Sequence, residues 1–115
     1  MSVKLNTRQV GDVTVMDVAG RITLGEGSSA MRDALREMVT KGQKKILLNL
    51  ADVSYIDSSG IGELVSGFTT VANAGGQLKM LNLNKRVKDL LQITKLYTVF
   101  DVHDDEAAAI RSFAA

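Results

Sequence analysis

The sequence predicts an α/β fold, with a mixed, mainly parallel β-sheet, an antiparallel hairpin at the N-terminus and about four α-helices. Residues 3–20 alternate between apolar and polar side chains on either side of the turn signal "VGD", which is typical of a β-hairpin. From residue 26 onward, segments with apolar residues at helical spacing alternate three times with short strand-like segments. Strands separated by helices usually pair in parallel, and no proline divides the chain. We therefore expect a single domain over residues 1–115.

The first helix, the central strand and the second helix have distinct patterns. Residues 26–42 predict a helix with Ser28 or Ser29 as its N-cap and Gly42 as its C-terminal stop. The segment "KKILLNL" (residues 44–50) suits a buried strand. A second helix follows, and its apolar stripe consists of Ile61, Leu64, Val65, Phe68, Val71 and Ala72.

The last third of the chain repeats this alternation. Residues 77–83 alternate as a strand does, and residues 84–94 predict a short helix that Asn84 caps. Residues 96–102 ("LYTVFDV") predict the final strand, and residues 104–115 predict the final helix, with acidic residues in its first turn. The expected order is two strands, three helix–strand units and a last helix.

Composition argues against several classes of function. The chain carries 14 basic and 13 acidic residues, for a formal net charge of +1, without the basic stripe typical of proteins that bind nucleic acids. It contains no cysteine, which excludes disulfides and thiolate metal sites. It shows neither a signal-peptide pattern nor an apolar run of about 18 residues. We therefore expect a cytoplasmic protein that neither spans a membrane nor binds nucleic acid.

Three catalytic or phosphotransfer interpretations have little support. His103 is the only histidine, and no G-x-S-x-G nucleophile motif accompanies it. The segment "GEGSSA" (residues 25–30) matches a dinucleotide-binding fingerprint, but the chain is too short for two nucleotide-binding halves. Asp57 follows a strand, as the acceptor of a response-regulator receiver does, but the early strands lack the acidic pair that would hold magnesium. We therefore expect a non-enzymatic protein without cofactor or metal.

The stretch "VSYIDSSGIGELV" has more polar residues and glycines than a helix start needs. One side chain suffices as an N-cap, yet Asp57, Ser58 and Ser59 stand in a row and are followed by Gly60 and Gly62. A glycine inside a helix costs about 1 kcal/mol relative to alanine, which makes sense where another surface must approach the backbone. A serine at a helix N-terminus also suits a phosphate group. Simple capping and a phosphorylation switch are both open on these residues alone.

The same stretch carries a resemblance to a known family. "LLNLADVSYIDSSGIGELV" closely resembles the signature of STAS-domain anti-sigma-factor antagonists, in which a buried strand and a short acidic turn precede D-S-S-G-[LI]-G. "VTVMDVAGRIT" is similar to the family's second strand and the turn after it, and residues 73–110 are similar to its last third. The likeness covers nearly the whole chain and implies a STAS fold.

The resemblance also implies a regulatory cycle. In the family, the unphosphorylated protein binds an anti-sigma factor that is also a GHKL-type serine kinase, and this binding frees a sigma factor. The kinase phosphorylates a serine that maps to Ser58, which reverses the binding, and a metal-dependent serine phosphatase resets the cycle. We expect a monomer when the protein is free. The residues expected at the partner surface are Arg21, Thr23, Asp57, Ser59, Gly60, Ile61, Gly62 and Glu63.

Other functions are compatible with the same resemblance. Many such antagonists carry an acidic residue after the glycine of the turn that follows the second strand, where this chain has Arg21, so the identity of the partner is open. STAS domains also serve as stressosome scaffolds and as subunits of lipid-transport complexes, so a scaffold or adaptor without sigma-factor control is the alternative. A nucleotide-hydrolysing enzyme is the alternative from another class, and turnover of ATP or GTP by the purified protein would reveal it.

Overall fold

A computed structural model of the protein describes residues 3–23 and 25–114. Its elements are β1 (Val3–Val10), β2 (Val13–Ile22), α1 (Glu26–Thr40), β3 (Lys45–Ile56), α2 (Ser58–Asn73), β4 (Gln77–Leu81), α3 (Lys85–Ile93), the 3-10 helix η1 (Leu96–Thr98), β5 (Asp101–His103) and α4 (Glu106–Ser112). The strands form one sheet in the order β1-β2-β3-β4-β5. β1 pairs with β2 antiparallel, and every later neighbour pairs in parallel. The predicted fold class is confirmed.

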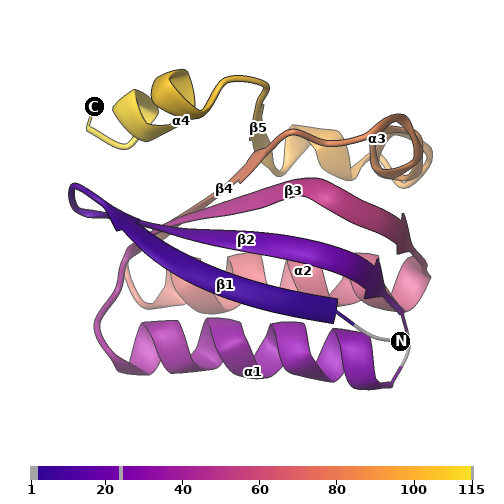
Figure 1. Cartoon of the computed structure of the whole chain (residues 1–115), viewed down its shortest axis with the longest axis horizontal. Coiled ribbons are helices and arrows are strands. Elements are labelled where there is room, and N and C mark those ends of the chain that lie inside the picture. The colour runs from indigo at the N-terminus through magenta and orange to yellow at the C-terminus, as the bar shows by residue number, and fades with distance from the viewer. Residues whose placement is uncertain (1–2, 24, 115) are drawn as a thin grey trace.

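The helices lie on both sides of the sheet (Figure 1). α1 and α2 run side by side along one face, and α4 lies over the opposite face. α3 lies beside the second half of β3, because β4 pairs with β3 only as far as Asn49 while β3 continues to Ile56. The side-chain amide of Asn84, which caps α3 as predicted, donates a hydrogen bond to the carbonyl of Val53 at 2.6 Å. α3 is thereby placed next to the end of β3, where α2 begins.

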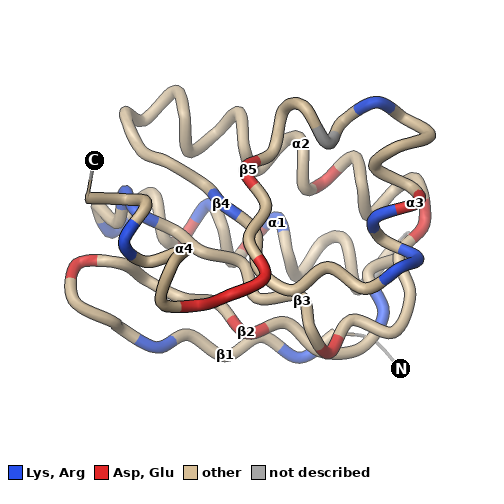
Figure 2. The backbone as a smooth tube through the Cα atoms, turned by 90° about the horizontal axis from the view of Figure 1, so that it is seen from above, with Lys and Arg blue, Asp and Glu red and all other residues tan. Residues whose placement is uncertain are grey.

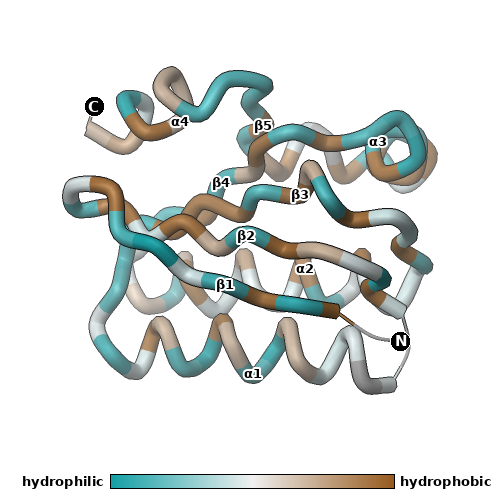
Figure 3. Tube along the Cα trace, viewed as in Figure 1, coloured by the Kyte–Doolittle hydropathy of each residue, from teal (hydrophilic) through white to brown (hydrophobic). Residues whose placement is uncertain are grey.

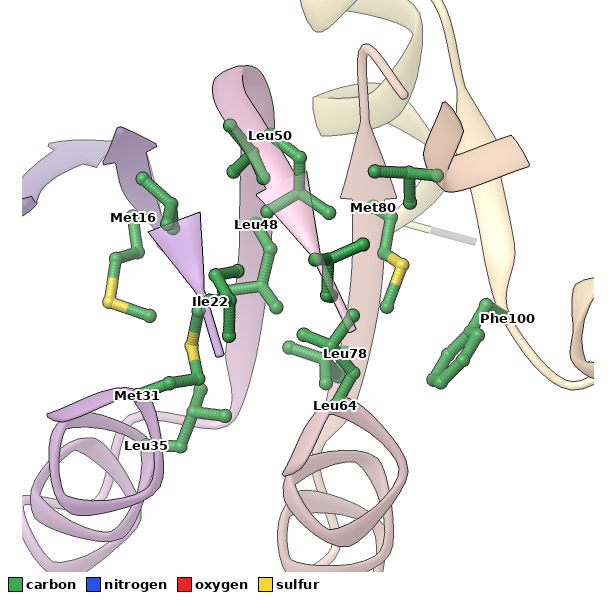
Figure 4. Packing of buried hydrophobic residues seen from close by; sticks show 14 of the residues in the cluster. Met16, Ile22, Met31, Leu35, Leu48, Leu50, Leu64, Leu78, Met80 and Phe100 are labelled. Carbon is green, nitrogen blue, oxygen red and sulfur yellow. The ribbon is translucent and has the colours of Figure 1, made fainter. Parts of the chain in front are cut away.

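The main core lies between the sheet and the pair α1 and α2, and it continues to Val87 and Leu91 of α3. Hydrophobic positions are concentrated along β2 and β3 (Figure 3), and side chains from both helices point toward them (Figure 4). Leu35 of α1 packs so closely against Gly67 of α2 that a Cβ at Gly67 would overlap with the Leu35 side chain. A smaller core under α4 covers the other face and consists of Val13, Val15, Leu47, Leu81, Ala109 and Phe113. Both faces of the central strands are thus buried, which explains the continuous apolar run in "KKILLNL".

The predicted N-cap of α1 is wrong. The helix begins at Glu26 and its N-cap is Gly25, with φ +97°, so Ser28 and Ser29 lie inside the first turns. A Cβ at Gly27 would lie 2.6 Å from the carbonyl oxygen of Arg21, so the chain turns tightly against the end of β2 and the helix starts early. The two glycines of "GEGSSA" therefore have a backbone explanation.

The predicted last strand is wrong over its first half. Leu96–Thr98 is a 3-10 helix, and β5 is confined to Asp101–His103. Lys95 adopts a left-handed conformation with φ +62° directly after α3, which turns the chain before it can extend. Leu96 and Phe100 then both face the core at a helical spacing, and the Phe100 ring packs edge-on against Phe68 at 5.6 Å between centroids. Tertiary packing overrides the strand pattern here.

Candidate functional site at the start of α2

Asp57 caps the helix that follows β3. Its Oδ1 accepts a hydrogen bond from the amide of Gly60 at 2.9 Å, and its own amide donates to the carbonyl of Ile22 at 3.3 Å. The loop is therefore held both to the helix start and to the end of β2. Ser58 is the first residue of α2 and is exposed, whereas Ser59 is half-buried. The cap is the aspartate, which leaves the Ser58 hydroxyl at the surface.

The two glycines of the loop differ in role. Gly60 is buried, and a Cβ there would overlap with the Ile22 carbonyl oxygen and the Ile56 side chain. This glycine lets α2 approach the ends of β2 and β3 closely. Gly62 is exposed, and a Cβ there would meet nothing within 4 Å. Packing within the chain explains Gly60 but not Gly62.

The remaining predicted surface residues fall into two groups. Arg21 is exposed and Thr23 is half-buried. Both are neighbours of Ile22, whose carbonyl accepts a hydrogen bond from the amide of Asp57, so both lie close to Asp57. Ile61 is 4% exposed and belongs to the core. The Glu63 side chain is 17% exposed, and its carboxylate lies 3.2 Å from Nη1 of Arg32 on α1. The exposed part of the predicted surface is therefore smaller than the sequence suggested.

Tyr55 and Arg86 belong to this site but were missed by sequence reasoning. The Arg21 guanidinium lies 4.8 Å from the centroid of the Tyr55 ring, and the Arg86 guanidinium lies 4.3 Å from it. Both are cation–π distances. The basic cluster "NKRVK" (residues 84–88) is visible in the sequence and indicates a group of positive charges. Only the docking of α3 beside β3, however, brings Arg86 to the Tyr55 ring. Two guanidinium groups therefore adjoin the loop that carries Ser58.

His103 lies on the edge strand β5, beside Asp101. Its Nε2 lies 3.1 Å from Oδ1 of Asp101 on the same short strand, and none of its described contacts is with Ser58 or Ser59. Burial alone would raise the pKa of Asp101, but the neighbouring Lys79 and His103 outweigh burial and lower it. Within residues 3–23 and 25–114, no group of three acidic or histidine side chains is arranged to hold a metal ion. No helix in this part of the chain is long and apolar enough to cross a membrane.

The fold and the loop together define a class of small α/β domains that present a capped, serine-bearing turn at the C-terminal edge of a mainly parallel sheet. The chain belongs to the STAS-domain family, whose family model matches residues 4–109.

Relatives and solved structures agree with this assignment. The anti-sigma-B factor antagonist of Bacillus subtilis (strain 168) is 31% identical over 102 residues, which are 89% of this chain and 92% of the relative. The crystal structure of an anti-sigma factor antagonist from Mycobacterium paratuberculosis has a TM-score of 0.84 at 15% identity and covers 98% of this chain and 95% of its own. The Bacillus cell fate determinant SpoIIAA in its phosphorylated form has a TM-score of 0.74 at 19% identity, covering 95% of this chain and 98% of its own. The structural likenesses concern the fold.

Proposed function

We propose that this protein is an anti-sigma factor antagonist whose binding is switched off by phosphorylation at Ser58. The single observation that carries the proposal is the position of Ser58, exposed and directly after the Asp57 cap in a D-S-S-G loop. The relatives named as anti-sigma factor antagonists support it. In this proposal the unphosphorylated chain binds an anti-sigma factor and thereby frees a sigma factor.

The proposed partner is an anti-sigma factor of the GHKL serine-kinase type, and a metal-dependent serine phosphatase removes the phosphate. The surface that meets the partner consists of the exposed residues Arg21, Ser58 and Gly62, with Thr23, Ser59 and Glu63 at its margin. Open space above Gly62 allows a partner to approach the backbone of α2 closely. This surface is supported from inside the domain by the buried residues Gly60 and Ile61 and by the Asp57 cap.

Phosphorylation changes this surface strongly without requiring the domain to unfold. A phosphoserine carries a charge of about −1.5 to −2 at neutral pH. The dipole at the start of α2 favours an anion, so the folded chain loses little. A partner that fits a neutral hydroxyl must instead desolvate the phosphate, and removing a charge from water is costly. The expected result is dissociation.

The test is a capture experiment followed by a kinase assay. The unphosphorylated chain is used as bait in a lysate of its source organism, and the captured proteins are identified by mass spectrometry. We expect an anti-sigma factor with a GHKL kinase domain. The purified kinase is then incubated with ATP, Mg²⁺ and the wild-type chain, Ser58→Ala or Ser59→Ala, and the phosphorylated site is mapped.

Phosphate on Ser58 in the wild type and in Ser59→Ala, but not in Ser58→Ala, supports the proposal. Modification of Ser59 or Asp57 instead would refute the assigned site. Capture of a membrane-transport or stressosome complex, with no anti-sigma factor, would favour the adaptor alternative. Preserved binding after stoichiometric phosphorylation would contradict the switch.

A further inference from the structure

A surface groove runs between the loop that carries Ser58 and the helix α3. Its volume is about 580 Å³, and one wall comes from the end of β3 and the start of α2 while the other comes from α3. The residues that line it are Tyr55, Ile56, Asp57, Ser58, Lys85, Arg86, Asp89, Leu90 and Ile93. Ser58 and Arg86 thus face the same hollow from opposite walls.

The two cations that line this groove, Lys85 and Arg86, differ in their described contacts. Lys85 lies 3.1 Å from Asp89 one turn along α3, and the Asp57 carboxylate accepts from Gly60. In Figure 2, basic and acidic positions lie close together along α3. Among the described residues, no carboxylate lies within ion-pair distance of Arg86, whose guanidinium is instead 4.3 Å from the Tyr55 ring centroid. Its charge is therefore available to an anion.

The arrangement around Tyr55 also favours the arrival of a negative charge. Arg21 lies 4.8 Å from the same ring centroid, so two positive groups gather on one side chain and repel each other. A stack on a half-exposed ring is a weak contact, whereas a guanidinium and a phosphate form two parallel, charge-assisted hydrogen bonds. The planar fork of arginine suits a phosphate in a way that lysine does not.

We propose that Arg86 captures the phosphate of phosphorylated Ser58 within the same chain, exchanging the Tyr55 ring for the phosphate oxygens. This inference rests on phosphorylation at Ser58, the switch proposed above. The capture ties the start of α3 to the switch loop. It also closes the groove beside Leu90 and Ile93, and Ile93 is 76% exposed. Phosphorylation then alters the surface of α3 as well as that of the loop.

The test places phosphoserine at position 58 during translation, so that no kinase is needed. The second pKa of the phosphate, ordinarily about 6, is measured by ³¹P NMR titration. In the otherwise wild-type chain we expect a titration midpoint at least about 0.5 pH units lower than in Arg86→Gln, because the guanidinium stabilises the dianion. Arg86→Lys should fall between the two, since it keeps the charge but loses the fork. Arg36→Gln, on the exposed face of α1, is the control and should match the wild type.

A second readout follows the Tyr55 ring. Its proton shifts should change when phosphoserine replaces Ser58 in the wild type and change much less in Arg86→Gln, where the Arg86 stack is already absent and only that of Arg21 remains. Equal midpoints in the wild type, Arg86→Gln and Arg86→Lys would overturn the proposal, as would an unchanged ring signal in the wild type. The result is independent of the kinase assay. If the kinase never modifies Ser58, the proposed function is refuted. The capture of the phosphate by Arg86, measured on the chain with phosphoserine at position 58, still stands.

Discussion

Gly60 and Ile22 are in direct backbone contact, 38 positions apart in the sequence: a Cβ at Gly60 would overlap with the Ile22 carbonyl oxygen. The same carbonyl accepts the amide of Asp57. The switch loop is therefore fixed to the end of β2 at its first residue and again three residues later. This attachment keeps the start of α2 in place while leaving Ser58 exposed.

The two glycines of the loop should respond oppositely to alanine. Gly60→Ala forces backbone atoms apart and should destabilise the protein by about 1–3 kcal/mol. Gly62→Ala adds a methyl group in open space inside a helix and should stabilise it by up to about 1 kcal/mol. Urea unfolding of both variants measures the difference. A loss of stability in Gly62→Ala would show that this glycine also serves packing.

The stability of the protein should depend on the side chain of Asp57, which caps α2, and hardly at all on that of Ser58. Asp57→Ala leaves the Gly60 amide without its acceptor and should cost about 0.5–2 kcal/mol of unfolding free energy. Ser58→Ala removes an exposed hydroxyl and should change stability by less than about 0.5 kcal/mol. Thermal and urea unfolding provide the comparison. Equal losses would mean that Ser58 contributes to the cap.

Bulk at Gly62 should weaken partner binding without weakening the fold. Gly62→Gln places a long side chain in the open space above α2, where the proposed partner approaches. We expect the affinity for the captured anti-sigma factor to fall by at least about tenfold, which corresponds to roughly 1.4 kcal/mol. Ala72→Gln, exposed near the other end of the helix, is the control. Titration calorimetry gives the affinities, and parallel losses in both variants would place the interface elsewhere.

An ion-pair network on the other face of the sheet should make stability depend on acid pH. Arg8 of β1 contacts Asp17 of β2 at 2.7 Å and also Glu106 of α4, and its hydrogen bonds lower the pKa of both carboxyls. A carboxyl with a lowered folded-state pKa contributes stability above its unfolded pKa, about 3.9 for aspartate and 4.3 for glutamate. That contribution is lost as the pH falls through the lower, folded-state pKa values.

The variant Arg8→Met tests this network. Its deficit in urea midpoint relative to the wild type should be largest at pH 6 and should shrink at pH 3 and below, where the carboxyls are increasingly protonated. The paired side chains are 35–40% exposed, so the effect is expected to be modest and to decrease in high salt. Lys85→Met, which breaks an exposed pair on α3, is the control. A deficit that does not vary with pH would mean that Arg8 acts by packing.

Most of the fold could be predicted from local patterns. The hairpin, the helix–strand order, the Asn84 cap and the end of α1 just before Gly42, which has φ +82°, all follow from residues within a few positions of one another. The errors occurred where a distant contact decided the local structure. Gly27 meets the Arg21 carbonyl and shifts the start of α1, and the packing of Phe100 converts an expected strand into a 3-10 turn.

The candidate site divides in the same way. The D-S-S-G loop and its position after a buried strand were determined by the sequence itself, because strand periodicity and capping chemistry act over short distances. Only the tertiary structure decided which groups surround that loop: the Ile22 carbonyl beneath Gly60, the open space above Gly62 and the Arg86 guanidinium at Tyr55. Strand pairing and the docking of α3 bring these groups together. Such contacts depend on how whole elements pack, and no pattern of neighbouring residues encodes them.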